Sequence, residues 1–119
     1  MDPYYLFLKQ TIDKGIEAAK EDYDNPEQKL YLQGAIAGFE ACRDKSPVEL
    51  LEIHQAASRR ASEAYVKRSR RYWYYRCYQM EVEWVLNVLS AGTQTQLLPN
   101  LPTVNGVRKA YEIMSTILQ

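Results

Sequence analysis

The chain is short and electrically balanced: its 119 residues carry 15 acidic and 15 basic side chains, so the formal net charge is zero. This length suits one domain, and a pI of about 6.6 argues against the basic surplus usual in nucleic-acid-binding proteins. No window approaches about 18 uninterrupted apolar residues, which argues against a membrane span, and we expect no signal peptide. The sequence therefore predicts a single domain over residues 1–119.

The charge is unevenly distributed along the chain. Residues 1–57 have 11 acidic and 6 basic side chains, a net charge of −5, whereas residues 58–119 have 4 acidic and 9 basic side chains, a net charge of +5. We expect these halves to attract each other, within one chain or head-to-tail between two chains.

The two cysteines, Cys42 and Cys77, both fall inside helical patterns among apolar neighbours. They form neither a disulfide framework nor a metal-binding pair. We therefore expect a reducing compartment and a cytoplasmic location.

Two helices are predicted in the N-terminal third, over about 3–23 and 26–44. Each is preceded by a preferred capping residue, Asp2 or Asn25, and each begins with proline. Apolar residues recur at three- and four-residue steps in both segments. Because the connection between them is short, we expect an antiparallel helical hairpin.

The second predicted helix contains two glycines, Gly34 and Gly38, four residues apart on one face. A glycine in a helix interior costs about 1 kcal/mol relative to alanine. Together with the small residues Ala41 and Cys42, these glycines leave a flat strip that another backbone can approach. We expect Gly34 and Gly38 to lie at a close helix crossing.

The longest segment without a helix-breaking residue follows Pro47. Ser46 is a preferred N-cap, Pro47 suits the first helical position, and Glu49 can complete a capping box. One unbroken helix over about 47–91 would span roughly 65 Å. We expect this very long helix to form the centre of an all-α helical bundle, with a kink at Ser69 if it breaks.

The second half of this long segment is apolar on most of its circumference, so it must be buried on most sides. Residues 72–89 present more apolar surface than the other predicted helices of one chain can easily cover. We therefore expect a homodimer or a larger oligomer. The interface candidates are Tyr74, Tyr78, Trp84, Val85, Val88 and Leu89.

The C-terminal part of the chain is expected to form a proline-containing loop followed by a short helix over about 104–118. Apolar residues recur there at helical spacing, so we expect this helix to pack along the long one. The sequence has no repeat, no low-complexity tract and no strand pattern. The predicted fold class is all-α.

Basic and aromatic side chains are interleaved over residues 65–78. Arginine forks suit phosphate and aromatic faces suit bases, so this composition could serve a nucleotide or a nucleic acid. However, the same residue types are enriched at protein–protein interfaces, and acids of the first hairpin, such as Glu21 and Asp24, can neutralise the arginines. The partner- or anion-binding candidates are Arg60, Lys67, Arg68, Arg70, Arg71, Tyr72, Trp73, Tyr75 and Arg76.

The sequence lacks a set of side chains typical of catalysis. His54 is the only histidine and has no partners for a zinc site, and Glu81 and Glu83 point to opposite sides of a helix. We therefore expect no enzymatic activity, no bound metal and no cofactor.

The hypothesis we favour is a protein-interaction module that binds itself and a partner protein, as an adaptor, a regulator or a phage-type inhibitor. The alternative is a binder of nucleotides or nucleic acid.

Overall fold

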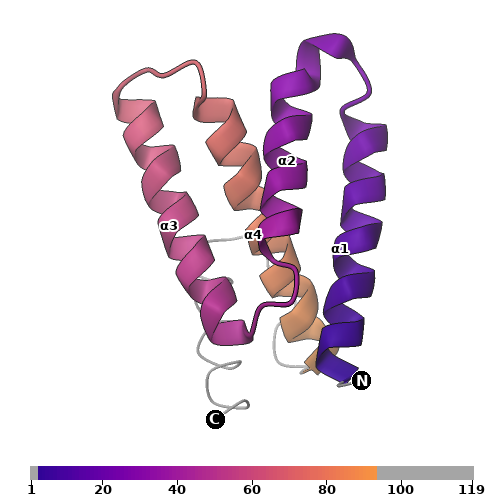
Figure 1. Cartoon of the computed structure of the whole chain (residues 1–119). Helices are drawn as coiled ribbons and strands as arrows, with labels where there is room; N and C mark the ends of the chain where they lie inside the picture. Colours follow the sequence, from indigo (N-terminus) through magenta and orange to yellow (C-terminus); the bar gives the residue numbers. More distant parts are fainter. Residues whose placement is uncertain (1–2, 94–119) are drawn as a thin grey trace.

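The computed structural model describes residues 3–93, and the regular structure in this range is entirely helical (Figure 1). The elements are α1 (Pro3–Asp22), the 3-10 turn η1 (Pro26–Gln28), α2 (Lys29–Ala41), α3 (Pro47–Val66) and α4 (Tyr72–Thr93). The prediction of an all-α fold is confirmed. The helix predicted over 104–118 lies outside the described residues. Within residues 3–93, no helix combines the length and the hydropathy that a membrane span requires.

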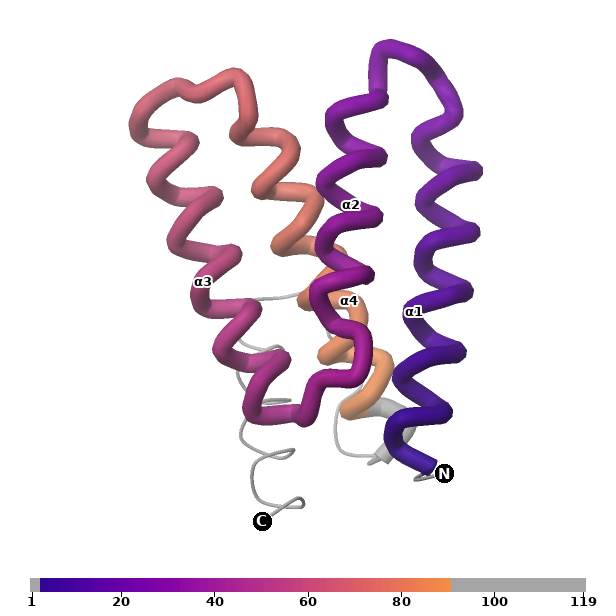
Figure 2. The backbone as a smooth tube through the Cα atoms, viewed as in Figure 1, coloured from indigo at the N-terminus to yellow at the C-terminus, as the bar shows by residue number. Residues whose placement is uncertain are grey.

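The four α-helices of this range form two antiparallel pairs, α1–α2 and α3–α4 (Figure 2). α4 packs against each of the other three, and its most extensive contact is with α2. α3 joins the bundle chiefly through α4. α4 is therefore the element that holds the two pairs together.

Two helix starts carry the caps that the sequence predicts. The side chain of Asn25 accepts a hydrogen bond of 2.9 Å from the backbone N–H of Glu27, and proline follows it. Ser46 and Glu49 form a complete capping box, since each side chain accepts a hydrogen bond from the other residue's backbone N–H, at 3.3 and 3.0 Å. These caps satisfy backbone donors that a helix N-terminus otherwise leaves unpaired.

The second predicted helix, 26–44, is shorter than expected. It opens with the 3-10 turn η1, and the α-helical part ends at Ala41. Asp44 has a φ of 57°, which a right-handed helix cannot contain. The backbone N–H of Lys45 instead bonds to the carbonyl of Cys42 in a turn that leads into α3.

The prediction of one very long helix over 47–91 is wrong, because the chain reverses direction between α3 and α4. Arg68 has a φ of 52°, in the left-handed region. Its N–H bonds to the carbonyl of Tyr65, and the N–H of Ser69 bonds to the carbonyl of Ala64, at 3.1 and 2.9 Å. This pair of bonds is a Schellman motif, a helix end that usually places glycine where this chain has arginine.

Ser69, where the sequence suggested a kink, lies in the turn that leads into α4. Its hydroxyl accepts a hydrogen bond of 3.1 Å from the N–H of Arg71, and its carbonyl accepts one of 3.2 Å from Tyr72. In a continuous helix, Lys67 would also stand three and four residues from Arg70 and Arg71, where like charges repel. The reversal lets α3 pack against α4.

The core lies around α4 and is formed by side chains from every α-helix in the described range. α3 contributes Leu50 and Leu51 near its start, but toward its end the buried residues are alanines, such as Ala57 and Ala61. The α3–α4 contact near the reversal therefore buries little apolar area. The members of the buried cluster are Leu8, Ile12, Ile16, Ala19, Ala35, Phe39, Cys42, Leu50, Leu51, Cys77, Val82, Val85, Leu86 and Leu89.

Gly34 and Gly38 lie on the face of α2 that meets α4, and both are buried. A Cβ atom at Gly38 would stand 2.6 Å from the carbonyl oxygen of Tyr78, and a Cβ at Gly34 would clash with the backbone of Tyr74. The obstacle is backbone in both cases, so it cannot move aside as a flexible side chain could. The two glycines thus let α2 and α4 approach backbone to backbone.

We expect Gly38→Leu to lower the free energy of unfolding by about 1–3 kcal/mol or more, because overpacking outweighs the gain in helix propensity. Chemical denaturation monitored by circular dichroism measures the change. Ala18→Leu, on the exposed face of α1, is the control and should leave stability nearly unchanged. A Gly38→Leu variant as stable as this control would contradict the close crossing.

We also expect Arg68→Gly to be more stable than Arg70→Gly by about 1 kcal/mol, because a left-handed conformation costs an L-residue about that much. The two substitutions remove the same charge and add the same freedom to the unfolded chain, so their difference isolates the backbone conformation at residue 68. Urea denaturation of the two variants side by side measures it. Equal stabilities would show that residue 68 does not need the left-handed conformation.

Candidate functional site

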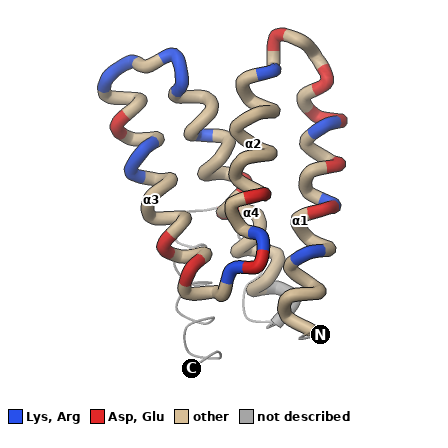
Figure 3. The backbone as a smooth tube through the Cα atoms, in the orientation of Figure 1, with Lys and Arg blue, Asp and Glu red and all other residues tan. Residues whose placement is uncertain are grey.

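The α3–α4 reversal carries a concentration of positive charge, which we call the basic turn: Lys67, Arg68, Arg70 and Arg71. All four residues are exposed, and in Figure 3 the α3–α4 turn, with its blue segments, lies at the same end of the bundle as the α1–α2 turn, which carries red segments. Residues 58–80 hold seven basic side chains and one acidic one. The predicted binding candidates thus gather where the chain reverses.

The basic turn is not neutralised by the first hairpin. Within residues 3–93, the carboxylate ion pairs involve Lys9, Arg43 and His54, and none involves a cation between residues 59 and 76. The idea that acids such as Glu21 and Asp24 pair with these arginines is therefore wrong for the described residues. The charges of the basic turn therefore have no carboxylate partner within residues 3–93.

A row of five aromatic rings crosses the bundle beside the basic turn. The row runs from Tyr65 on α3 to Tyr72 and Trp73 on α4, with centroid separations of 5.5 and 5.0 Å. It continues to Tyr31 on α2 and to Tyr23 after α1, at 5.5 and 6.0 Å. Tyr65 is 68% exposed and Trp73 49% exposed. This aromatic row is therefore partly structural and partly available to a partner.

The remaining binding candidates lie on two faces of the α3–α4 pair. Arg60 and Tyr75 line a hollow of about 290 Å³ together with Lys67. Arg71 stands over the ring of Tyr74, 5.1 Å from its centroid, in a cation–π arrangement. The candidates therefore form a surface that wraps the reversal, and they do not converge on one enclosed pocket.

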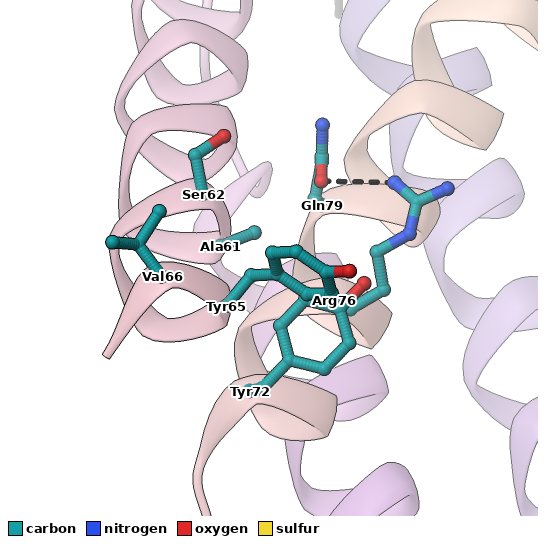
Figure 4. Close-up of a pocket in the computed structure, with 7 residues that line it drawn as sticks. All are labelled: Ala61, Ser62, Tyr65, Val66, Tyr72, Arg76 and Gln79. Atoms are coloured by element: carbon teal, nitrogen blue, oxygen red, sulfur yellow. Dashed lines mark hydrogen bonds between the residues drawn. The ribbon is translucent and has the colours of Figure 1, made fainter. Parts of the chain in front are cut away.

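A groove of about 550 Å³ lies between α3 and α4, on the side of this helix pair that carries Tyr72 (Figure 4). Arg76 lies along it and donates a hydrogen bond of 2.9 Å from Nη1 to Oε1 of Gln79. Gln79 in turn donates from Nε2 to the hydroxyl of Ser58 on α3, also at 2.9 Å. Gln79 and Ser58 were not predicted as site residues, because their contact depends on the reversal that brings α3 against α4. The groove is lined by Ala61, Ser62, Tyr65, Val66, Tyr72, Arg76 and Gln79.

Two of the predicted oligomer-interface residues are misassigned. Val85 and Leu89 have no exposed surface, because α4 is covered by the chain's own helices. Tyr74, Tyr78 and Val88 are half-buried. Trp84 remains 40% exposed, with its ring 5.7 Å from that of Phe39. Self-association stays a prediction, and the main argument for it from the sequence is weakened.

His54 and Glu83 form a titratable pair between two helices of the bundle. Their side chains bond across α3 and α4 at 3.0 Å, and both are largely buried. This pair links the middle parts of the two helices. Within the part of the chain that the structure describes, no group of three or more His, Cys, Asp or Glu side chains could hold a metal ion.

Glu81 stands on the side of α4 that faces the end of α1. Burial, reinforced by the negative charge of Asp22, raises the pKa of Glu81 from 4.5 to about 7. Burial, followed by the influence of Cys77 and Glu81, raises the pKa of Tyr23 to about 12. Burial is the main cause of both pKa shifts. The carboxylate of Glu81 is therefore in an unfavourable environment when it ionises near neutral pH.

The pKa of Glu81 gives a test with a defined sign. Because the folded pKa of about 7 exceeds the ordinary 4.5, the native state holds more protons than the unfolded state between these values, and stability falls as pH rises through this window. We expect Glu81→Gln to melt at a higher temperature than wild type at pH 8, by an amount that shrinks toward pH 5. Glu52→Gln, at an exposed position of α3, is the control and should show no such trend. If Glu81→Gln changed the melting temperature equally at pH 8 and pH 5, the raised pKa of Glu81 would be contradicted.

No family of known proteins matches this chain, and neither does a curated protein or a solved structure. The interpretation of the surface therefore rests on its own geometry and charge.

Proposed function

We propose that this protein is a non-catalytic binding module whose basic turn and aromatic row engage an acidic surface on a partner protein. The observation that carries the proposal is that Lys67, Arg68, Arg70 and Arg71 are exposed and have no carboxylate partner within residues 3–93. Exposed aromatic side chains stand directly beside them. Arginine, tyrosine and tryptophan are the residue types that most often dominate the energetics of protein interfaces.

Two features favour a protein partner over a nucleic acid. The acidic α1–α2 turn, with Asp22, Asp24 and Glu27, lies at the same end of the bundle and would repel an extended polyanion (Figure 3). In addition, the rings of Tyr72 and Trp73 contact each other and their neighbours at steep angles, so they do not form the open platform on which bases stack. A partner protein can place its acids over the basic turn alone.

A role as adaptor, regulator or inhibitor follows from this type of surface, since such proteins act by occupying a site on another protein. A charged rim of this kind speeds association and selects partners of opposite charge. Binding should therefore be rapid and sensitive to salt. The alternative function, binding of nucleotides or single-stranded nucleic acid, uses the same residues and is separated by the following experiment.

The test compares two fluorescent probes at about 150 mM salt, where the screening length is about 8 Å. One is a peptide of Glu-Glu-Leu repeats and the other is an oligothymidylate of equal charge. We expect the peptide to bind wild type, and the double reversal Arg70→Glu/Arg71→Glu to weaken binding at least about tenfold, mainly through slower association. Fluorescence anisotropy and stopped-flow mixing measure these changes.

The matched control is Lys9→Glu/Lys14→Glu, which makes the same charge change at exposed positions of α1. It should leave peptide binding nearly unchanged. Both double variants alter exposed charges, so each should change the free energy of unfolding by no more than about 1 kcal/mol. Preferential binding of the oligothymidylate, lost in the Arg70→Glu/Arg71→Glu variant, would reject the protein-partner proposal in favour of phosphate recognition.

A further inference from the structure

The groove between α3 and α4 contains a guanidinium whose charge is not compensated. Arg76 is half-buried, yet it makes no ion pair within residues 3–93, and its hydrogen-bond acceptor is the neutral amide of Gln79. A guanidinium carries five N–H donors, so one bond to an amide leaves most of its capacity unused. The groove therefore presents a strong donor for an anion.

The guanidinium of Arg76 is held by a side chain that is itself anchored on the opposite helix. Gln79, on the same helix as Arg76, accepts a hydrogen bond of 2.9 Å from the arginine and donates one of 2.9 Å to Ser58, so Gln79 links α4 to α3 and positions the arginine. A side chain held in this way loses less freedom when it binds a ligand. The arrangement resembles a preformed binding site more than a mobile surface arginine.

The other walls of the groove are apolar or aromatic. The floor is Ala61, which is 4% exposed, and the rings of Tyr65 and Tyr72 meet at 5.5 Å beside Arg76 (Figure 4). Val66 at the rim is 79% exposed. The residues that α3 buries near the reversal are alanines, whose short side chains leave the groove unfilled. Its volume of about 550 Å³ is large enough for a few side chains.

We propose that this groove is the seat of an acidic segment of the partner protein, with one carboxylate on Arg76 and a neighbouring aliphatic side chain between Tyr65 and Val66. The inference rests on the function proposed above and names the anchoring residue. Charge complementarity selects the occupant, because the groove opens among seven basic side chains and one acidic one over residues 58–80. Inside the groove, a single guanidinium against apolar walls suits one carboxylate beside an apolar residue.

The experiment titrates the Glu-Glu-Leu peptide into four variants of the full chain at about 150 mM salt. Arg76→Gln removes the charge, and Gln79→Glu supplies an internal carboxylate that occupies the guanidinium. Arg59→Gln removes an exposed charge of α3 outside the groove, and Arg70→Glu/Arg71→Glu reports on the basic turn. The Nε–H resonance of Arg76 is followed by NMR, and the affinity by anisotropy.

We expect Arg76→Gln and Gln79→Glu each to weaken peptide binding at least about tenfold, the range expected for a charge-assisted hydrogen bond. Arg59→Gln should change affinity by less than about threefold, as an exposed rim charge does. The Nε–H resonance of Arg76 should shift when the peptide is added. A matched peptide that has glutamine instead of glutamate should not shift this resonance. Gln79→Glu should melt no lower than wild type, which separates a blocked groove from a damaged fold.

The outcomes distinguish this inference from the function on which it rests. One outcome is that Arg70→Glu/Arg71→Glu abolishes peptide binding while Arg76→Gln and Gln79→Glu bind the peptide as well as Arg59→Gln does. This would show that the basic turn binds the acidic peptide and that the groove does not. If the peptide fails to bind wild type, both proposals are overturned. If oligothymidylate binds in place of the peptide and is lost in the Arg76 variant, the groove recognises phosphate and the peptide proposal is rejected.

Discussion

The reversal of the chain between α3 and α4 is the constraint on which the rest of this structure depends. It rests on two backbone hydrogen bonds and on Arg68 in a left-handed conformation, and Ser69 follows in the turn before α4. Once the chain has turned, α3 and α4 run antiparallel in one register. His54 then meets Glu83, Ser58 meets Gln79 and Tyr65 meets Tyr72. Each step along α3 toward the turn is matched by an equal step back along α4.

This register determines both the core and the surface. α4 is apolar around most of its circumference, and burial of such a helix is the main favourable contribution to folding. The glycines of α2 bring one helix close to it, and α3 covers another side. α3 buries only alanines near the turn, and a groove lies there beside Arg76. The charges of the basic turn have no carboxylate partner within residues 3–93, and we propose this end of the bundle as the binding surface.

Much of the local structure could be predicted from the sequence, because caps and apolar spacing are local signals. The caps at Asn25 and Ser46, the first hairpin and the all-α class all follow from residues a few positions apart. The reversal could not be predicted in this way, since its left-handed residue is an arginine and not the glycine that usually marks such a helix end. The misplaced interface residues Val85 and Leu89 follow from that single error, because a rod would have left them uncovered. The bond between Ser58 and Gln79 depends on the same reversal and leaves no local signal in the sequence, whereas Arg76 and Gln79 are three residues apart on one helix.

The most direct test of the reversal between α3 and α4 is the distance between spin labels at two exposed positions, Gln55 of α3 and Met80 of α4. Pulsed electron paramagnetic resonance on the doubly labelled chain reports it in solution, and the buried Cys42 and Cys77 can be replaced by serine or alanine to avoid background labelling. The reversal predicts a separation of about 10–20 Å, as packed helices lie about 8–10 Å apart and each label adds an arm. A continuous helix would give roughly 38 Å. A distribution centred at that longer distance would contradict the account, and with it the groove and the shared end of the basic and acidic turns.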